Sequence, residues 1–377
     1  MATVSSSTAA ATLFGTPRPV LTTLARLADE PVDLPPVLAA DRVYAGDRSG
    51  NLQALDASGA PVWSCRLKGP LEHPPTPAPD GSVYVLGGRN LHRISPEGKL
   101  LWARPLLEPM NAPVVQGERI YVSTRGCMLL AFDPDGNEKA RIHDALGTPH
   151  SFFVLPGPGK SVLLVGNQGR VVRYDPTSLL FKSKRLKDLP GIAGRPPRLG
   201  PDGRYYFITM EPGMRHHLVA LQPATGRVEM DVALGEFSLP GQPGLGLPGS
   251  IALALAGGAV HLFDANGSER GVLPGLVEKL PVDPTLEVNT MGSDGALITG
   301  SKSAPRLICL GEELEVPSDI VGAARGPEGW LYVTRRNGDV SRLELRVVPE
   351  DSSSAVTEDA GSVRFGSVRL KKRLAPG

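Results

Sequence analysis

A module of about 40 residues recurs along the chain, and this recurrence constrains the fold more than any other feature. Each copy contains an apolar stretch, a turn with Asp and Gly, a Val-Tyr-Val type strand, a turn with Arg or Gly, and two further strands. The clearest copies span residues 42–67, 82–106 and 119–142. A period near 40 residues with four short strands per unit is typical of a β-propeller.

The third strand of each module sets a register that allows the modules to be counted. The register position is most often an Asp, and it is occupied by Asp56, Ser95, Asp133, Asp175, Gln222, Asp264, Cys309 and Glu344. The first and the last of these lie seven steps apart, so the mean step is about 41 residues. The sequence therefore predicts an all-β fold, a single eight-bladed β-propeller with four-stranded antiparallel blades; a seven-bladed ring is the alternative.

The last module lacks an outer strand, and a matching segment lies at the other end of the chain. Residues 23–36 align with residues 64–75 if one residue is allowed to slip. We expect residues 21–28 to pair into the last blade and close the ring, which removes open sheet edges. The competing interpretation is a chance match in a disordered leader. The expected organisation is a flexible leader at 1–20, the propeller at 21–348 and a polar, disordered tail at 349–377.

The turns after the third strands carry a family resemblance. Residues 54–59 with Trp63 read ALDASG…W, residues 220–230 read ALQPATGRVEM, and Gly98 and Trp102 recur in the second module. This pattern resembles the repeat of the PQQ-like (quinoprotein-type) propellers, AxDxxTGxxxW, with one residue deleted in the first copy. A Gly in this turn supplies a positive φ, and the Trp provides a rigid apolar plate between blades.

The resemblance implies one of two functions, a secreted quinone-dependent dehydrogenase or a non-catalytic scaffold. The dehydrogenases carry a vicinal cysteine pair, a calcium site and an export signal. The cysteines of this chain, Cys65, Cys127 and Cys309, are far apart, and neither an export signal nor a lipobox-like cysteine is recognisable near the N-terminus. The scaffold branch is therefore the expected one, with no cofactor, metal or catalytic residue.

The charge balance gives no sign of nucleic-acid or membrane binding. Lys and Arg total 40 and Asp and Glu total 39, and no apolar run approaches the roughly 20 residues of a membrane span. We expect a cytoplasmic protein with protein partners.

Several local motifs mimic functional sites, and we interpret them structurally. Residues 157–161 (GPGKS) lack the first Gly of a P-loop, and residues 133–137 (DPDGN) place Gly too early for a calcium loop. Both are interpreted as turns. The adjacent His216 and His217 point to opposite faces of a strand, so a shared metal is not expected. Lys182, Lys184, Arg185 and Lys187 are interpreted as charges that protect an outer edge strand.

A basic residue recurs in the turn between the second and third strands. These residues are Arg48, Arg89, Arg125, Arg170, Arg215, Lys302, Arg335 and Arg336. Antiparallel order places all these turns on one face, whereas the turns of the opposite face tend to be acidic. The basic ring is a candidate docking surface for an acidic segment of a partner protein. The alternative is that the arginines pair with acids of the blade connections, such as Glu72, Glu108, Asp144 and Glu236.

The function that these observations favour is a non-catalytic protein-interaction scaffold, a subunit of a larger cytoplasmic assembly. The alternative is a propeller that binds a small molecule or cofactor, including an enzyme of the quinoprotein or lactonase type. Propeller sites are assembled from separate blades, and fold alone does not fix function.

Overall fold

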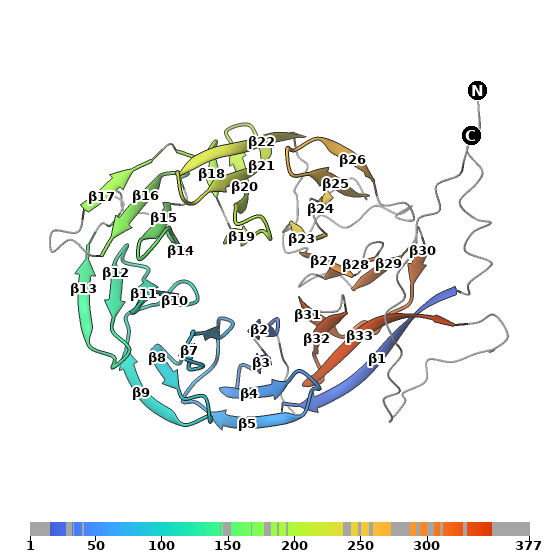
Figure 1. Ribbon diagram of the computed structural model, residues 1–377, viewed down its shortest axis with the longest axis horizontal. Helices are drawn as coiled ribbons and strands as arrows, with labels where there is room; N and C mark the ends of the chain where they lie inside the picture. The colour runs from blue at the N-terminus through green and yellow to red at the C-terminus, as the bar shows by residue number, and fades with distance from the viewer. Residues whose placement is uncertain are drawn as a thin grey trace, which may run out of the picture.

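The structure is a computed structural model, and it describes residues 16–27, 32, 34–39, 41–143, 145, 152–166, 168–176, 182–186, 188–193, 195–236, 243–247, 250–255, 259–272, 287–291, 295–299, 305–309, 312–326 and 330–348. The described residues form eight antiparallel sheets arranged in a ring around a central axis (Figure 1). The prediction of an eight-bladed propeller is confirmed, and the seven-bladed alternative is wrong.

Blades 1 to 4 follow one another along the chain, and each runs from its innermost to its outermost strand. Blade 1 contains β2 (Val37–Ala39), β3 (Arg42–Gly46), β4 (Asn51–Asp56) and β5 (Pro61–Arg66). Blade 2 contains β6 (Thr76–Pro77), β7 (Val83–Gly87), β8 (Asn90–Ile94) and β9 (Leu100–Pro105). Blade 3 contains β10 (Val114–Gln116), β11 (Arg119–Ser123), β12 (Leu129–Phe132) and β13 (Glu138–Ile142). Blade 4 contains β14 (Phe152–Pro156), β15 (Val162–Gly166), β16 (Val171–Asp175) and β17 (Lys182–Arg185).

Blades 5 to 7 repeat this order, except that the innermost strand of blade 5 is in two pieces. Blade 5 contains β18 (Ile192–Ala193), β19 (Arg198–Leu199), β20 (Tyr205–Glu211), β21 (Arg215–Gln222) and β22 (Arg227–Glu236). Blade 6 contains β23 (Gly244–Leu247), β24 (Ser250–Leu255), β25 (Ala259–Asp264) and β26 (Glu269–Val272). Blade 7 contains β27 (Glu287–Met291), β28 (Gly295–Thr299), β29 (Arg306–Cys309) and β30 (Glu312–Leu314).

Blade 8 joins the two ends of the described chain. It contains β31 (Ile320–Arg325), β32 (Leu331–Arg335) and β33 (Asp339–Val348), and its outer strand is β1 (Thr16–Arg26). In Figure 1 the blue β1 lies beside the orange-red β33. The prediction that residues 21–28 pair into the last blade is confirmed for residues 21–26, and Ala28 lies outside the described residues. The strand is longer than expected, because pairing begins at Thr16 opposite Val348, inside the segment expected to be a flexible leader. Residues 1–15 and the predicted tail at 349–377 lie outside the described residues.

The core is divided among the contacts between successive blades. Each of eight clusters of buried residues in the described chain joins one blade to the next. The middle strands are apolar on both faces because each blade is sandwiched between two neighbours; Val83–Gly87 is buried at every position. The cluster that closes the ring places Ala25 of β1 with Val43 of blade 1 and Tyr332 of blade 8.

The outer strands contact the following blade through a glycine turn. Trp63 of β5 packs on Gly98, where an added Cβ would lie 2.7 Å from the indole Cγ. Gly98 has a φ of 84°, which a side chain rarely adopts. Leu24 of β1 packs in the same way on Gly59 of blade 1. The N-terminal strand therefore makes the contact between blades that the tryptophans make elsewhere.

A β-bulge recurs in the outer strands and explains two of the exposed apolar side chains. The register skips one residue near the start of the outer strands of blades 1, 2, 3, 5 and 6, namely Val62, Leu101, Lys139, Glu229 and Arg270. The outer strand of blade 5 has a second such shift, at Leu234. Val62 and Leu101 are about half exposed at these bulges (44% and 50%). Bulges twist an outer strand and make its edge a poorer template for another strand.

Candidate functional site

The turns between the second and third strands lie on one face of the ring, which we call the basic-turn face. The structure places the predicted residues there: Arg48, Arg89, Arg125, Arg170 and Arg336 in these turns, Arg215 at the start of β21 and Arg335 at the end of β32. The prediction that these residues share a face follows directly from the strand order. Lys302 lies outside the described residues.

The turn of blade 1 is held by a buried carboxylate. Asp47 accepts hydrogen bonds from the backbone N–H groups of Ser49 and Asn51, both at 2.9 Å, and from the Asn51 amide at 2.7 Å. Asp47 is fully buried, whereas the adjacent Arg48 is exposed. In blade 2, Arg89 is exposed and has a φ of 62°, so the backbone of this turn is in the left-handed region. The turn of blade 1 therefore presents Arg48 on a hydrogen-bonded backbone.

In the part of the chain that the structure describes, the ion pairs of Arg125 and Arg335 lie on the same face. Arg125 lies 3.8 Å from Glu108, and both side chains are more than half exposed. Arg335 lies 3.0 Å from Asp319 and 3.5 Å from Asp339, and its side chain is only 17% exposed. The alternative interpretation, pairing with acids of the blade connections, is therefore right for these two residues. Arg335 therefore joins β32 and the start of β33 to the connection that precedes β31.

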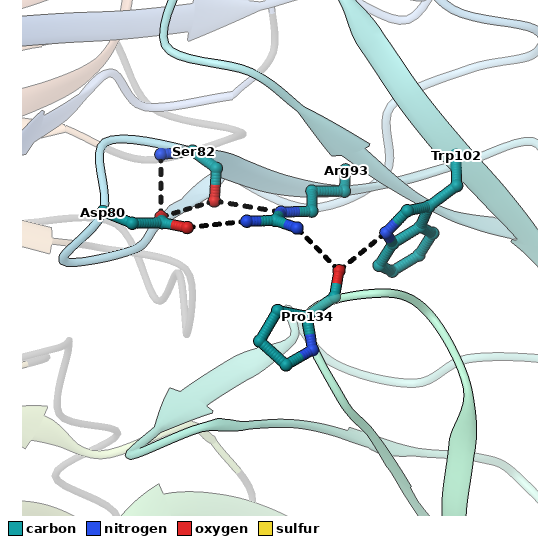
Figure 2. Close-up of polar contacts among 5 residues, drawn as sticks. All are labelled: Asp80, Ser82, Arg93, Trp102 and Pro134. Carbon is teal, nitrogen blue, oxygen red and sulfur yellow. Dashed lines mark hydrogen bonds and ion pairs between the residues drawn. The ribbon is translucent and has the colours of Figure 1, made fainter.

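Arginines and tryptophans on the opposite side of the blades form a recurring contact between neighbours. Figure 2 shows Arg93 and Trp102 of blade 2, which both donate to the carbonyl of Pro134 in blade 3, at 2.7 and 2.8 Å. Arg93 also lies 2.6 Å from Asp80. Burial raises the pKa of Asp80, but hydrogen bonds from Ser82 and Arg93 outweigh it, so the pKa lies below its ordinary value. This acidic turn therefore has a structural role.

The same contact is made one blade earlier. Arg42 and Trp63 of blade 1 donate to the carbonyl of Pro96 in blade 2, at 3.0 and 2.9 Å. Sequence reasoning found the tryptophans but missed these arginines. In the sequence, each of these arginines is only a basic residue in a second or third strand, and such a residue looks the same as an ordinary exposed charge.

The motifs interpreted as turns are turns. Residues 157–161 connect the antiparallel strands β14 and β15, and the Ser161 hydroxyl donates to the Pro158 carbonyl at 2.7 Å. Asp133 accepts from the Asn137 backbone at 2.8 Å and lies 2.8 Å from the Lys139 ammonium, so it closes a hairpin. Lys182, Lys184 and Arg185 lie in β17, the outer strand of blade 4, as predicted, and Lys187 lies outside the described residues.

The two adjacent histidines have different surroundings. His217 Nδ1 lies 2.7 Å from an Asp231 carboxylate oxygen, whereas His216 is buried and burial lowers its pKa. Among the residues that the structure describes, no group of three His, Cys, Asp or Glu side chains is placed to hold a metal ion. Cys65 is a free thiol whose pKa is raised to about 11 by burial, so very little of it is thiolate at neutral pH.

The innermost strands of four blades line a cavity of about 300 Å³ that the sequence did not reveal. Its lining is Pro35, Pro36, Arg198, Leu245, Val288, Asn289, Ala323, Ala324 and Arg325. These residues come from β19, β23, β27 and β31 and from the segment before β2. They are far apart in the chain and meet only because the ring closes.

A second, wider depression of about 620 Å³ lies between blades 2 and 3, on the side of the ring. Leu107, which is 70% exposed, lines it together with Met128 and Leu130. Arg104, Glu138 and Arg141 are also in its lining. Arg141 is paired with Glu138 at 2.7 Å, so much of the charge here is already neutralised.

Comparison with known proteins finds a family likeness over the first blades of the ring. The family model described as outer membrane protein assembly factor BamB matches residues 22–90 and 48–178. Over residues 22–178 the chain is therefore similar to the PQQ-like β-propellers, the family that its repeat pattern resembles. No curated protein matches it.

Solved structures share the fold of the whole ring. The chain superposes on BamB from Moraxella catarrhalis with a TM-score of 0.61 and 16% identity, covering 86% of this chain and 98% of that one. It also superposes on the computationally designed Ika8 protein with a TM-score of 0.59 and 11% identity, covering 86% and 99%. At these identities the likeness establishes the fold. The described part of the chain contains no helix with the length and hydropathy of a membrane span.

Proposed function

We propose that this chain is a non-catalytic protein-interaction scaffold and a subunit of a larger assembly in the cytoplasm. The observation that carries the proposal is the presence of exposed arginines in the same turn of consecutive blades, Arg48, Arg89 and Arg125. The name of the matching family, an outer membrane protein assembly factor, supports a role in assembly rather than in chemistry.

The partner chemistry follows from the charge of these turns. Guanidinium groups pair with carboxylates through two parallel hydrogen bonds, so an acidic segment of another protein is the matching partner. Rim charges of this kind act mainly on the rate of encounter, and salt screens them over a Debye length of about 8 Å at physiological ionic strength. We therefore expect binding that weakens as the salt concentration rises.

The test is a charge reversal on the basic-turn face. The triple variant Arg48→Glu, Arg89→Glu and Arg125→Glu is immobilised beside the unmodified protein, and the proteins retained from an extract of the native host are identified by mass spectrometry. Each retained candidate is then purified and its affinity measured. We expect the triple variant to bind the partner at least about tenfold more weakly, because each lost charge pair is replaced by repulsion.

A matched triple variant controls for net charge. Lys99 and Lys160 are exposed cations in turns of the opposite face, and Arg227 is an exposed cation at the start of β22 on that face. Their replacement by Glu changes the net charge by the same amount and is expected to leave partner binding intact. Equal loss in both triple variants, or unchanged binding in the first, contradicts the proposed docking face.

The cavity favours a second candidate function, small-molecule binding. Its lining combines apolar side chains with two arginines and one asparagine, the composition that small-ligand sites have. One form of this function, a quinoprotein-type enzyme, can be tested by a simple measurement. The visible absorbance and metal content of the freshly purified protein would reveal a bound quinone and its ion.

A further inference from the structure

The depression between blades 2 and 3, which we call the side groove, opens onto the basic-turn face. Met128, in the basic turn of blade 3, lines one end of it, and Gly136, in a turn of the opposite face, lines the other. Leu106, Leu130 and Phe132, from the apolar cluster that joins the two blades, also line it. The side groove therefore offers apolar surface directly beside the proposed docking face.

Leu107 lies at the exposed edge of the side groove, between two of the basic turns. The Leu106 N–H donates to the Arg89 carbonyl of blade 2 at 2.9 Å. The Arg125 N–H of blade 3 donates to the Glu108 carbonyl, also at 2.9 Å. At 70% exposure, Leu107 is the most exposed large apolar side chain in the part of the chain that the structure describes. An exposed leucine that continues an apolar groove is a mark of an interaction surface.

The backbone on both sides of Leu107 is held in an uncommon conformation. Among the described residues, four that are not glycine have a positive φ, and three of them are Arg89, Glu108 and Cys127. Arg89 and Cys127 belong to the basic turns of blades 2 and 3, and Glu108 follows Leu107. Such conformations persist only where the surrounding structure holds them, and they cluster at binding sites. The strained backbone is thus concentrated beside the side groove.

The charges around the side groove favour an acidic partner. Two acids and two arginines form pairs that cancel, namely Glu138 with Arg141 and Glu108 with Arg125. Arg104 in the groove wall donates to backbone carbonyls, including that of Gly136 at 2.7 Å, and carbonyls carry no formal charge. Arg89 is exposed in the adjacent turn. Among these residues the surplus charge is therefore positive, and carboxylates of a partner complement it.

We propose that the side groove holds a large apolar side chain of the partner protein, next to carboxylates that face Arg89. The partner is an acidic segment in which a leucine or phenylalanine acts as the anchor. Met128 is unbranched and flexible, so it adapts to the shape of that anchor. Interfaces concentrate their binding energy in such buried anchors, whereas charges at the rim mainly set the rate of encounter. This inference rests on the proposed docking function, because it describes the partner of the same face more narrowly.

Three peptides with blocked ends separate the anchor from the charges. They are Glu-Glu-Leu-Phe-Glu-Glu, Glu-Glu-Ala-Ala-Glu-Glu and Lys-Lys-Leu-Phe-Lys-Lys, and isothermal titration calorimetry on the full chain measures their affinities. The first is expected to bind at least about tenfold more tightly than either of the others, because only it has both the anchor and the carboxylates. Equal affinity for the first two peptides, or no saturable binding of the first at about 5 mM, overturns the proposal.

The variant Leu107→Ala removes apolar surface from the side groove without opening the core, since the side chain is largely exposed. It is expected to weaken binding of the Leu-Phe acidic peptide about fivefold to tenfold. Leu100→Ala is the matched control, because Leu100 is 54% exposed, lies on β9 of the same blade and does not line the groove. Both variants should melt like the unmodified protein. Equal peptide affinity in the two variants overturns the proposal.

Binding of the partner found with the charge-reversal variant distinguishes this inference from the proposed function. We expect both the charge-reversal variant and Leu107→Ala to bind that partner more weakly. If only the charge-reversal variant loses binding, the docking face is supported and the anchor is wrong. If the Leu-Phe acidic peptide binds as expected but the charge-reversal variant keeps its partner, the side groove is supported and the docking face is wrong. Unchanged partner binding and no peptide binding overturn both.

Discussion

At the residue scale, the ring depends on one contact that is repeated between blades. An outer-strand side chain packs on a glycine in the third turn of the next blade, as Trp63 packs on Gly98 and Trp102 on Gly136. The indole N–H then donates to a carbonyl in the same turn. Two independent features require Gly at this position. The backbone has a positive φ, and the indole leaves no room for a Cβ.

The variant Gly98→Ala separates these two requirements when it is compared with Gly213→Ala. Gly213 has a similar φ of 89°, but nothing lies within 4 Å of an added Cβ. We expect Gly213→Ala to lower the free energy of unfolding by about 1 kcal/mol through backbone strain, and Gly98→Ala by about 2–4 kcal/mol because the Trp63 contact is also disturbed. Urea unfolding followed by tryptophan fluorescence measures both. Equal losses would show that the indole contact adds nothing.

The Asp80 carboxylate predicts a pH effect of definite sign. Its folded-state pKa is lowered, since the hydrogen bonds from Ser82 and Arg93 outweigh the effect of burial. Its contribution is therefore present above the unfolded-state pKa near 4 and is lost as the pH falls through the folded-state value. The difference in unfolding free energy between the unmodified protein and Asp80→Asn, about 1 kcal/mol at pH 7, should shrink between pH 5 and pH 3.

Asp135 provides the comparison for this experiment, because it is an exposed carboxylate in a third turn of the next blade. Asp135→Asn should change the unfolding free energy by less than about 0.5 kcal/mol at either pH. A difference between Asp80→Asn and the unmodified protein that stays constant from pH 7 to pH 3 would be inconsistent with the role assigned to the carboxylate.

At the element scale, β1 is the strand on which ring closure depends. It pairs with β33 from Thr16 opposite Val348 to Arg26 opposite Asp339. Leu21 packs against the cluster between blades 7 and 8, and Ala25 is buried in the cluster between blades 8 and 1. Without β1, the whole length of β33 would present an unpaired edge to other chains.

Deletion of residues 1–26 should therefore destabilise the protein far more than deletion of residues 1–15, which leaves β1 intact. We expect the larger deletion to lower the free energy of unfolding by roughly 3 kcal/mol or more, since it uncovers apolar surface of two blade contacts. It should also promote self-association. Thermal unfolding and size-exclusion chromatography of both deletions measure these effects. Identical melting temperatures would mean that β1 contributes nothing to the ring.

At the scale of the whole molecule, the repeat made most of the fold predictable. The register residues such as Asp56 and Asp264 lie at the ends of third strands, and their carboxylates accept hydrogen bonds from the turn backbone. Such turns are local, so a periodic pattern reveals them. The start of β1 at Thr16 was not predicted, because segment 16–20 contains Pro17 and Pro19. Proline has no backbone N–H to donate, so its presence argues against a strand.

The two candidate sites differ in the same way in how far the sequence could predict them. The basic-turn face was predictable because its arginines recur at the period of the blades and antiparallel order fixes their side of the ring. The central cavity was not predictable. Arg198, Asn289 and Arg325 have no common spacing, and they meet only when innermost strands of different blades surround one axis. Pairing of Arg335 with Asp319 likewise depends on the connection that precedes β31.

The central claim is that partner proteins dock on the basic-turn face, and site-specific photo-crosslinking in the native host tests it most directly. A photoreactive amino acid is introduced at Arg48 or Arg89 on that face, or at Lys99 or Arg227 on the opposite face. The account predicts that the same partner protein is crosslinked from positions 48 and 89 and from neither of the other two. Crosslinks that form only from positions 99 and 227, or from none of the four, would contradict it.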